Sequence, residues 1–234
     1  MRTLINGRWP LNLPPHRAAR PSWPWWEATR LAAMRHFIQP GDTVYDIGAE
    51  EGDFPALFAS WGAHLVLVEP NPHVWPCIRW TWEANDLPAP LKWHVGLLGD
   101  APQSADLDDS NAVDMDGWPA CAYGPMIPDH GFRHLNEHAG IVSPVTTLDL
   151  LAQGLPPDVV TMDVEGGELH VLRGAQETLA EHRPIVFVSI HPEFMHDLYG
   201  ITNGVREVVE FMAQLGYTDE FLTADHEHHY LFTP

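Results

Sequence analysis

The chain has 234 residues, 45% of them hydrophobic, which allows one large domain or two small ones and excludes a disordered protein. Its formal net charge of −20 opposes contact with a phosphate backbone, so we expect no nucleic-acid partner. No apolar run reaches the ~18 residues that span a bilayer, and the N-terminus lacks a signal-peptide pattern, so we expect no membrane association. The two cysteines, Cys77 and Cys121, are far apart, which favours reduced thiols and a cytoplasmic protein.

The N-terminal 24 residues are rich in Pro, Trp and Arg and show no periodicity, which indicates an arm that covers the rest of the protein. Residues 25–38 have apolar side chains at helical spacing and predict a helix. Short apolar runs then alternate with helical patterns. We expect strands at 43–48, 64–70, 92–99, 158–164, 184–191, 217–224 and 226–233, helices at 54–62, 72–85, 168–182 and 204–216, and a short segment with a helix over 145–154.

This alternation predicts an α/β fold with a doubly wound, mostly parallel, Rossmann-like sheet of seven strands. Only "DHE" separates the last two strands, too little for a crossover helix, so the sheet is expected to end in an antiparallel hairpin. Residues 100–142 have no clear period and predict an irregular insertion that faces the substrate. We therefore divide the chain into an arm with a covering helix (1–40) and one α/β domain (41–234).

Polar residues stand at the ends of four expected strands. Asp46, Glu69 and Asp163 each follow an apolar run, and His191 ends another. In open α/β sheets, ligands bind outside the carboxyl ends of the strands, so these side chains are expected to line one site. The alternative for any one of them is a solvated residue in a surface loop.

The segment "DIGAEEG" (46–52) is a tight turn from strand to helix, in which Gly48 would let the backbone approach a ligand closely. It lacks the G-x-G-x-x-G pattern of dinucleotide sites. Glu50 and Glu51 would repel a pyrophosphate, whereas an ammonium or sulfonium ligand would tolerate them. Glu69 follows the first strand by ~20 residues, the usual place for an acid that binds ribose hydroxyls.

Four segments in this order, "VYDIGAEEG", "LVEPNP", "TTLDLL" and "MDVEGGELHVLRGA", resemble the FkbM family of S-adenosylmethionine-dependent methyltransferases over about residues 41–191. The most specific piece is D-V-E-G-x-E-x-x-x-L-x-G, and every fixed position is present from Asp163 to Gly174. The resemblance implies a class I methyltransferase fold, S-adenosylmethionine as cofactor, and methyl transfer to a hydroxyl, usually on a sugar or a glycosylated small molecule.

The resemblance also assigns roles along the chain. Glu69 would bind the ribose hydroxyls, Leu97 and Leu98 would flank adenine, and Asp163 would face the methyl-transfer site. The complete set that the resemblance places at the cofactor is Asp46, Gly48, Ala49, Glu50, Gly52, Glu69, Pro70, Leu97, Leu98 and Asp163. Two positions depart from the family, which often has Asn at position 50 and an acid at position 191.

Catalysis at a sugar hydroxyl requires a base or a metal ion, because the hydroxyl is otherwise a poor nucleophile. Asp163 and His191 are the candidates for base and orienting partner. They could instead share a divalent cation, Mg or Mn, with the histidine shifting the preference towards Mn, Fe or Zn. The alternative for His191 is a structural histidine bonded to a backbone carbonyl. Glu165 is a third candidate catalytic residue, and Glu168 is expected to cap the following helix or to support the site.

Three other clusters carry weaker signals. "DLDDSN" (106–111) begins like a calcium loop but lacks its glycine and its bidentate glutamate, so a solvated loop is favoured. "DHEHH" (225–229) is rich in metal ligands, but on a strand His226 and His228 face one side while Glu227 and His229 face the other, so only part of it can converge. "WPWWE" (23–27) could stack on a sugar, but Trp25 and Trp26 are expected to anchor the arm on the core, with Glu27 as a candidate pocket residue.

Two other functions remain open from sequence. One is a nucleotide-dependent oxidoreductase on a similar sheet, and the other is a catalytically inactive binding protein that has kept the fold. The expected acceptor is a small molecule or a glycan, and no motif defines the oligomeric state.

Overall fold

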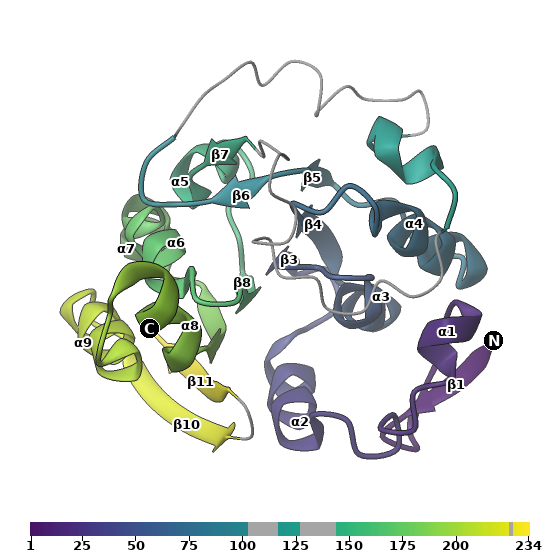
Figure 1. The fold of residues 1–234 in the computed structure, drawn as a ribbon, viewed down its shortest axis with the longest axis horizontal. Helices are drawn as coiled ribbons and strands as arrows, with labels where there is room; N and C mark the ends of the chain where they lie inside the picture. Colours follow the sequence, from purple (N-terminus) through teal and green to yellow (C-terminus); the bar gives the residue numbers. More distant parts are fainter. Residues whose placement is uncertain (103–116, 127–143, 225–226) are drawn as a thin grey trace.

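The computed structural model describes residues 1–102, 117–126, 144–224 and 227–234 (Figure 1). The strands are β1 (Arg2–Ile5), β2 (Trp9–Asn12), β3 (Thr43–Ile47), β4 (His64–Val68), β5 (Lys92–His94), β6 (Leu97–Leu98), β7 (Val145–Thr146), β8 (Val159–Asp163), β9 (Ile185–Ile190), β10 (Thr218–Ala224) and β11 (His228–Thr233). The helices are α1 (Pro15–Ala18), α2 (Ala28–Phe37), α3 (Asp53–Ser60), α4 (Trp75–Ala84), the 3-10 helix η1 (Ala120–Tyr123), α5 (Leu148–Leu151), α6 (Glu168–Arg173), α7 (Gln176–His182), α8 (Pro192–Tyr199) and α9 (Gly204–Gln214).

The central sheet has seven strands in the order β10-β11-β9-β8-β3-β4-β5. Neighbouring strands from β9 to β5 are parallel, whereas β11 runs antiparallel to both β9 and β10. The predicted fold class, a mostly parallel seven-stranded sheet that ends in an antiparallel hairpin, is therefore confirmed. None of the helices in the described part of the chain has both the length and the apolar character needed to cross a membrane.

Two separate cores pack on the two faces of the sheet, because successive strand residues point to opposite sides. In β3, Val44 belongs to the core under α2, α3 and α4, while Tyr45 belongs to the core under α6, α7 and α9. The same alternation appears in β8, where Val159 and Val160 divide between the two cores. Figure 1 shows these two groups of helices on opposite sides of the sheet. Strands covered on both faces explain the continuous apolar runs in the sequence.

The N-terminal segment is more regular than the sequence indicates. Residues 1–12 form the antiparallel β1–β2 hairpin, with α1 directly after it, and β2 lies against α3. The side chains of Leu11, Leu13 and Trp23 are buried in the core. Two reciprocal hydrogen bonds of 2.7 and 2.8 Å join the backbone of Asn12 to the side chain of Asn85 at the end of α4. The segment that we expected to be a covering arm is thus a folded hairpin and helix, whose short strands leave no clear period in the sequence. Trp26 packs against the core as expected, whereas Trp25 is 66% exposed, so its expected role as an anchor was wrong.

Three predicted elements differ in detail. The strand expected over 92–99 is split, because β6 leaves the main sheet and pairs with β7. The helix expected over 168–182 is two helices that break around Gly174, where a Cβ atom would lie 1.9 Å from the backbone oxygen of Gly99. Helix α8 was not predicted, although Pro192 stands at its first turn, where proline is favoured. Most of the expected insertion at 100–142, including the calcium-like loop at 106–111, lies outside the described residues.

Candidate active site

Close packing at the carboxyl edge of the sheet shapes the loop after β3. The backbone N–H groups of Gly48 and Ala49 both donate to the carbonyl of Val68, at 2.9 and 3.1 Å. Gly48 has φ +89°, and a Cβ atom there would lie 1.9 Å from the backbone oxygen of Asp163. The lack of a side chain at Gly48 thus allows close packing against the end of β8, and the predicted approach to a ligand stays a prediction. Any side chain at position 48 would separate the β3 loop from Asp163.

Two buried carboxyl groups lie beside this loop. Asp46 accepts a hydrogen bond from the hydroxyl of Thr161, while its buried Oδ2 atom has no hydrogen-bond partner among the described residues. Glu69 accepts the N–H groups of Glu50 at 2.9 Å and Asn71 at 2.7 Å. Burial raises the pKa of Asp46 to about 7 and that of Glu69 to about 8. A ligand that brought hydroxyl donors or positive charge here would satisfy both groups, which is what the ribose and sulfonium of S-adenosylmethionine offer.

The remaining predicted cofactor residues follow the same edge. Ala49 is buried, Gly52 immediately precedes α3, and Pro70 is half-buried directly after β4. Leu98 of β6 is buried in the core under α6 and α7, and its neighbour Leu97 is half-buried. These positions are compatible with the predicted roles, which stay predictions.

The acids of the first turn are held by the N-terminal segment. Arg17 is almost fully buried and donates to both carboxylate oxygens of Glu50, at 3.0 and 2.9 Å, and to Asp53. His16 Nε2 lies 2.6 Å from Glu51 Oε2. Arg17 therefore compensates part of the negative charge that we expected to repel a pyrophosphate, and that expectation stays a prediction.

The two predicted catalytic side chains come together. Nε2 of His191 lies 3.6 Å from Oδ1 of Asp163, and its Nδ1 lies 2.8 Å from Oε1 of Glu168. Glu168 is fully buried and also accepts the N–H of Gly166 at 3.0 Å. A third carboxylate, that of Glu227, lies 2.8 Å from Nε2. The alternative of a histidine bonded to a backbone carbonyl is wrong, because carboxylates surround the imidazole.

These carboxylates decide the protonation of His191. Burial lowers its pKa, but the hydrogen bonds that the imidazole donates to Glu168 and Glu227 and the charge of Asp163 outweigh burial and raise the pKa to about 11. The imidazole is thus a cation in this arrangement and has no free site for a further proton. This arrangement suits Asp163 as the base and His191 as its orienting partner, and both roles stay predictions.

Asp163 has a second basic neighbour from α2. The guanidinium of Arg30 lies 3.4 Å from Oδ2 of Asp163 and 2.8 Å from Glu27, and it packs over the ring of Phe54 at 4.7 Å. Glu27 has φ +45°, an uncommon backbone conformation for glutamate, and burial raises its pKa to about 7 although Arg30 opposes this. The predicted pocket role of Glu27 is thus linked to Asp163 through Arg30. Glu165, the third predicted catalytic residue, lies half-buried in the turn after β8 with φ +52°.

The comparisons with known proteins decide the family. The sequence model of the methyltransferase FkbM domain matches residues 46–218. The chain belongs to the FkbM family. The comparison with curated proteins gives no match.

The solved structures agree on the fold. A methyltransferase FkbM from Methylobacillus flagellatus KT is 15% identical, with a TM-score of 0.54 over 83% of this chain and 44% of that one. This chain therefore spans less than half of that relative. Precorrin 8w decarboxylase from Methanobacterium thermoautotrophicum (11% identity, 89% and 90% coverage) and ribosomal protein L11 methylase from Lactobacillus delbrueckii subsp. bulgaricus (9%, 88% and 75%) both have a TM-score of 0.50. At these identities the similarity shows the fold alone, that of class I S-adenosylmethionine-dependent methyltransferases.

Several residues at this site lie outside the matched FkbM segment. Arg17, Glu27 and Arg30 precede it, and Glu227 follows it. Sequence analysis missed both arginines, because a single buried arginine in a short helix leaves no periodic signal. Glu227 had a signal in "DHEHH", where one of the two sides converges in the structure: Glu227 and His229 are both buried and 3.7 Å apart.

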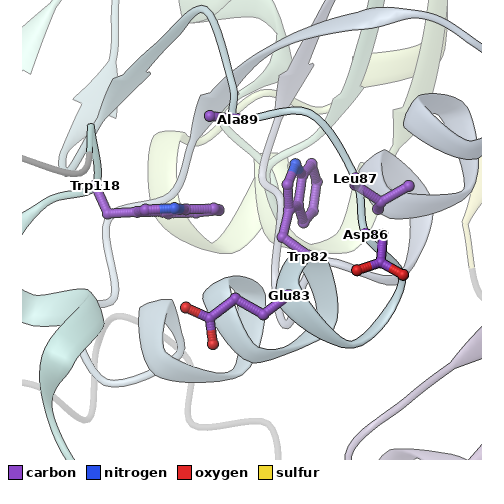
Figure 2. Close-up of a pocket in the computed structure, with 6 residues that line it drawn as sticks. All are labelled: Trp82, Glu83, Asp86, Leu87, Ala89 and Trp118. Carbon is purple, nitrogen blue, oxygen red and sulfur yellow. The ribbon is translucent and has the colours of Figure 1, made fainter.

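The described residues also form a cleft of about 450 Å³ far from this edge. Figure 2 shows its lining, in which Trp82 of α4 and Trp118 lie edge to face with ring centroids 5.9 Å apart. Helix α4 starts beside Glu69, at the carboxyl end of β4. The loop after α4 returns to the amino end of β4, where the backbone N–H of Leu91 donates to the carbonyl of Leu65. The cleft therefore opens at the opposite end of the sheet from Asp163 and is not the candidate active site.

Proposed function

We propose that this protein is an S-adenosylmethionine-dependent O-methyltransferase whose acceptor is a hydroxyl on a sugar or a glycosylated small molecule. Membership of the FkbM family supports methyl transfer. The observation that carries the proposal is Asp163, a carboxylate at the end of β8 that Arg30 and the His191 imidazolium hold on opposite oxygens. Because the chain has a net charge of −20, we place the acceptor among small molecules or glycans and not among nucleic acids or membranes. We place the protein in the cytoplasm.

The residues present fit the cofactor. The unpartnered oxygen of Asp46 and the carboxyl of Glu69 lie at the edge where the β3 and β4 loops meet. S-adenosylmethionine supplies an electrophilic methyl group on a cationic sulfur. Buried acids stabilise that charge, and ribose hydroxyls would donate to Glu69. Both groups need such a partner, because burial makes their ionised forms costly.

The chain's own residues can then activate the acceptor. Asp163 is the most exposed carboxylate in contact with His191, with 31% of its side chain accessible, so an acceptor hydroxyl can reach it. Its carboxylate accepts the hydroxyl proton as the oxygen attacks the methyl group in line. His191 and Arg30 fix the orientation of the carboxylate and compensate its charge.

A divalent cation, Mg or Mn, also fits this edge. Asp163 and the neutral imidazole of His191, after loss of its Nε2 proton, would hold it, and it would supply Lewis acidity that lowers the pKa of a bound hydroxyl. Carboxylate oxygens suit both metals, and the imidazole favours Mn over Mg.

Calorimetric titration with S-adenosylmethionine and, separately, with NAD tests the class. We expect micromolar binding of S-adenosylmethionine alone. Glu69→Ala should weaken it by about 10- to 100-fold, because hydrogen bonds to a charged group contribute about 1.5–3 kcal/mol. The matched control is Glu83→Ala, an exposed acid on α4 that should change nothing.

Turnover tests the reaction. Formation of S-adenosylhomocysteine with a panel of sugars and glycosides should depend on an acceptor hydroxyl and be lost in Asp163→Asn. Binding of NAD in place of the sulfonium cofactor would support the oxidoreductase. Cofactor binding without turnover on any hydroxyl acceptor would refute the O-methyltransferase and favour the inactive binding protein.

A further inference from the structure

The β10–β11 hairpin brings Glu227 to His191. The antiparallel ladder between β11 and β9 ends at the pair of His228 and Ile190, and Glu227 and His191 are the residues directly beyond this pair. The Glu227 side chain is 4% exposed, and its Oε2 atom lies 2.8 Å from Nε2 of His191. Backbone pairing therefore fixes a buried carboxylate against the nitrogen that also faces Asp163.

The three side chains present their ligand atoms to one small volume. One atom each from Asp163, His191 and Glu227 lies within 4.8 Å of the other two. Asp163 uses Oδ1 on this side, while Arg30 contacts its other oxygen. The guanidinium therefore leaves this oxygen available to a cation.

Glu168 acts on the other side of the imidazole. Its carboxylate lies 2.8 Å from Nδ1 and fixes which nitrogen faces the two other acids. Histidine ligands of metals almost always donate their second ring N–H to a carboxylate or carbonyl, which sets the tautomer and the orientation of the ring. Glu168 is not one of the three ligands, so its position supports the site independently.

The charged side chains around His191 also favour a bound cation. Four buried or half-buried carboxylates, those of Glu27, Asp163, Glu168 and Glu227, face one guanidinium, that of Arg30, and the imidazoles of His191 and His229. Carboxylates removed from water need compensating positive charge. Binding of a divalent ion at Nε2 of His191 would release the proton that this nitrogen shares with Glu227, and the ion would replace the positive charge of that proton.

We propose that Glu227 completes, with Asp163 and His191, a three-ligand site for a divalent cation of the Mn²⁺ class, with Glu168 as the residue that positions His191. The role of the ion in methyl transfer rests on the proposed function, whereas its binding does not. Two carboxylates and one imidazole form a mixed oxygen and nitrogen set that suits Mn²⁺ better than Mg²⁺.

A second group of possible ligands is less suitable. His16, Glu51 and Cys77 also have ligand atoms within 4.8 Å of one another. However, Arg17 Nε lies 3.5 Å from Glu51 Oε2, the same oxygen that faces His16, so a cation already occupies this position. Cys77→Ser tests this group and leaves the proposed site intact.

The experiment is a titration of the full chain with Mn²⁺ in the absence of cofactor and acceptor. Calorimetry measures the binding, and the electron paramagnetic resonance signal measures the Mn²⁺ that stays free. Wild type should bind one equivalent. Glu227→Gln should weaken binding at least tenfold, and Glu168→Gln about 10- to 100-fold. Glu220→Gln, an exposed acid on β10 of the same hairpin, is the matched control and should bind as wild type.

Thermal melts show which variants are folded, and Glu227→Asp, which keeps the charge, provides a second measurement if the glutamine variant unfolds. Failure of wild type to bind Mn²⁺, equal binding by Glu227→Gln, or loss of binding in Cys77→Ser instead would each overturn the proposal. Binding of S-adenosylhomocysteine is measured separately. If it persists without any Mn²⁺ binding, the cation site fails while the methyltransferase stands.

Discussion

Gly48→Ala tests the packing that brings the β3 loop to Asp163. The new Cβ atom would lie 1.9 Å from the backbone oxygen of Asp163, so the two segments must separate by about 1.4 Å to reach the ~3.3 Å of an ordinary carbon–oxygen contact. The φ of +89° adds strain of about 1–2 kcal/mol, and the forced movement about 1–3 kcal/mol. We expect a total loss of about 2–5 kcal/mol in the free energy of unfolding.

The chain provides a matched control at Gly41. Its φ is +94°, and a Cβ atom there would meet no atom within 4 Å, so Gly41→Ala carries the backbone strain without the clash. Urea unfolding of both variants isolates the clash as the difference between them, about 1–3 kcal/mol. Equal destabilisation within about 0.5 kcal/mol would refute the reasoning. Because Asp163 moves only in Gly48→Ala, only this variant should also lose affinity for Mn²⁺.

Three further predictions concern buried charge and packing. Arg17→Met should destabilise the protein by about 3–5 kcal/mol in urea unfolding, because it leaves buried acids without their cation, whereas the half-exposed Arg20→Met should cost less than about 1 kcal/mol; similar losses would contradict this. Burial raises the pKa of Glu69 from 4.5 to about 8, so the native state retains a proton that the unfolded state has released, and the stability contributed by Glu69 should fall as pH rises from 4.5 to 8. Glu69→Gln should flatten this slope in unfolding curves at several pH values, and an unchanged slope would assign it to other groups. Gly174→Ala should destabilise by about 1–3 kcal/mol through its contact with Gly99 alone, since its φ of −83° is unstrained; a neutral effect would show that the α6–α7 break can relax.

The sheet could be predicted because its information is local. Strands covered on both faces must be apolar throughout, and helices must show a 3.6-residue period. Each of these elements can therefore be predicted from its own residues. The antiparallel hairpin at the edge of the sheet was predictable because the turn between its two strands is too short for a crossover helix. The elements that were missed lack such a signature: the β1–β2 hairpin has four-residue strands, and α8 follows directly from β9 without a loop that marks its start.

The candidate site was predictable only where it follows strand ends. Asp163 and His191 come directly after apolar runs, and the sheet rule places them together. Arg30 reaches Asp163 across 133 residues, and Glu227 reaches His191 through the β11–β9 pairing. Such contacts depend on tertiary geometry, which a single sequence does not display. The protonation of His191 depends on all of these contacts, so it could not be predicted from the sequence.

The division between the FkbM segment and the rest of the chain has a functional meaning. Residues 46–218 supply Asp46, Glu69 and Asp163, the groups expected at the cofactor and the methyl group. Arg30 and Glu227 contact Asp163 and His191 from outside this segment. In the proposed function they lie towards the acceptor, whereas Asp46 and Glu69 lie towards the methyl donor. We therefore expect substitutions at Arg30 and Glu227 to change acceptor turnover and cation binding while S-adenosylhomocysteine affinity stays within about twofold of wild type. A parallel loss of cofactor affinity would show that the two parts of the chain do not divide the site in this way.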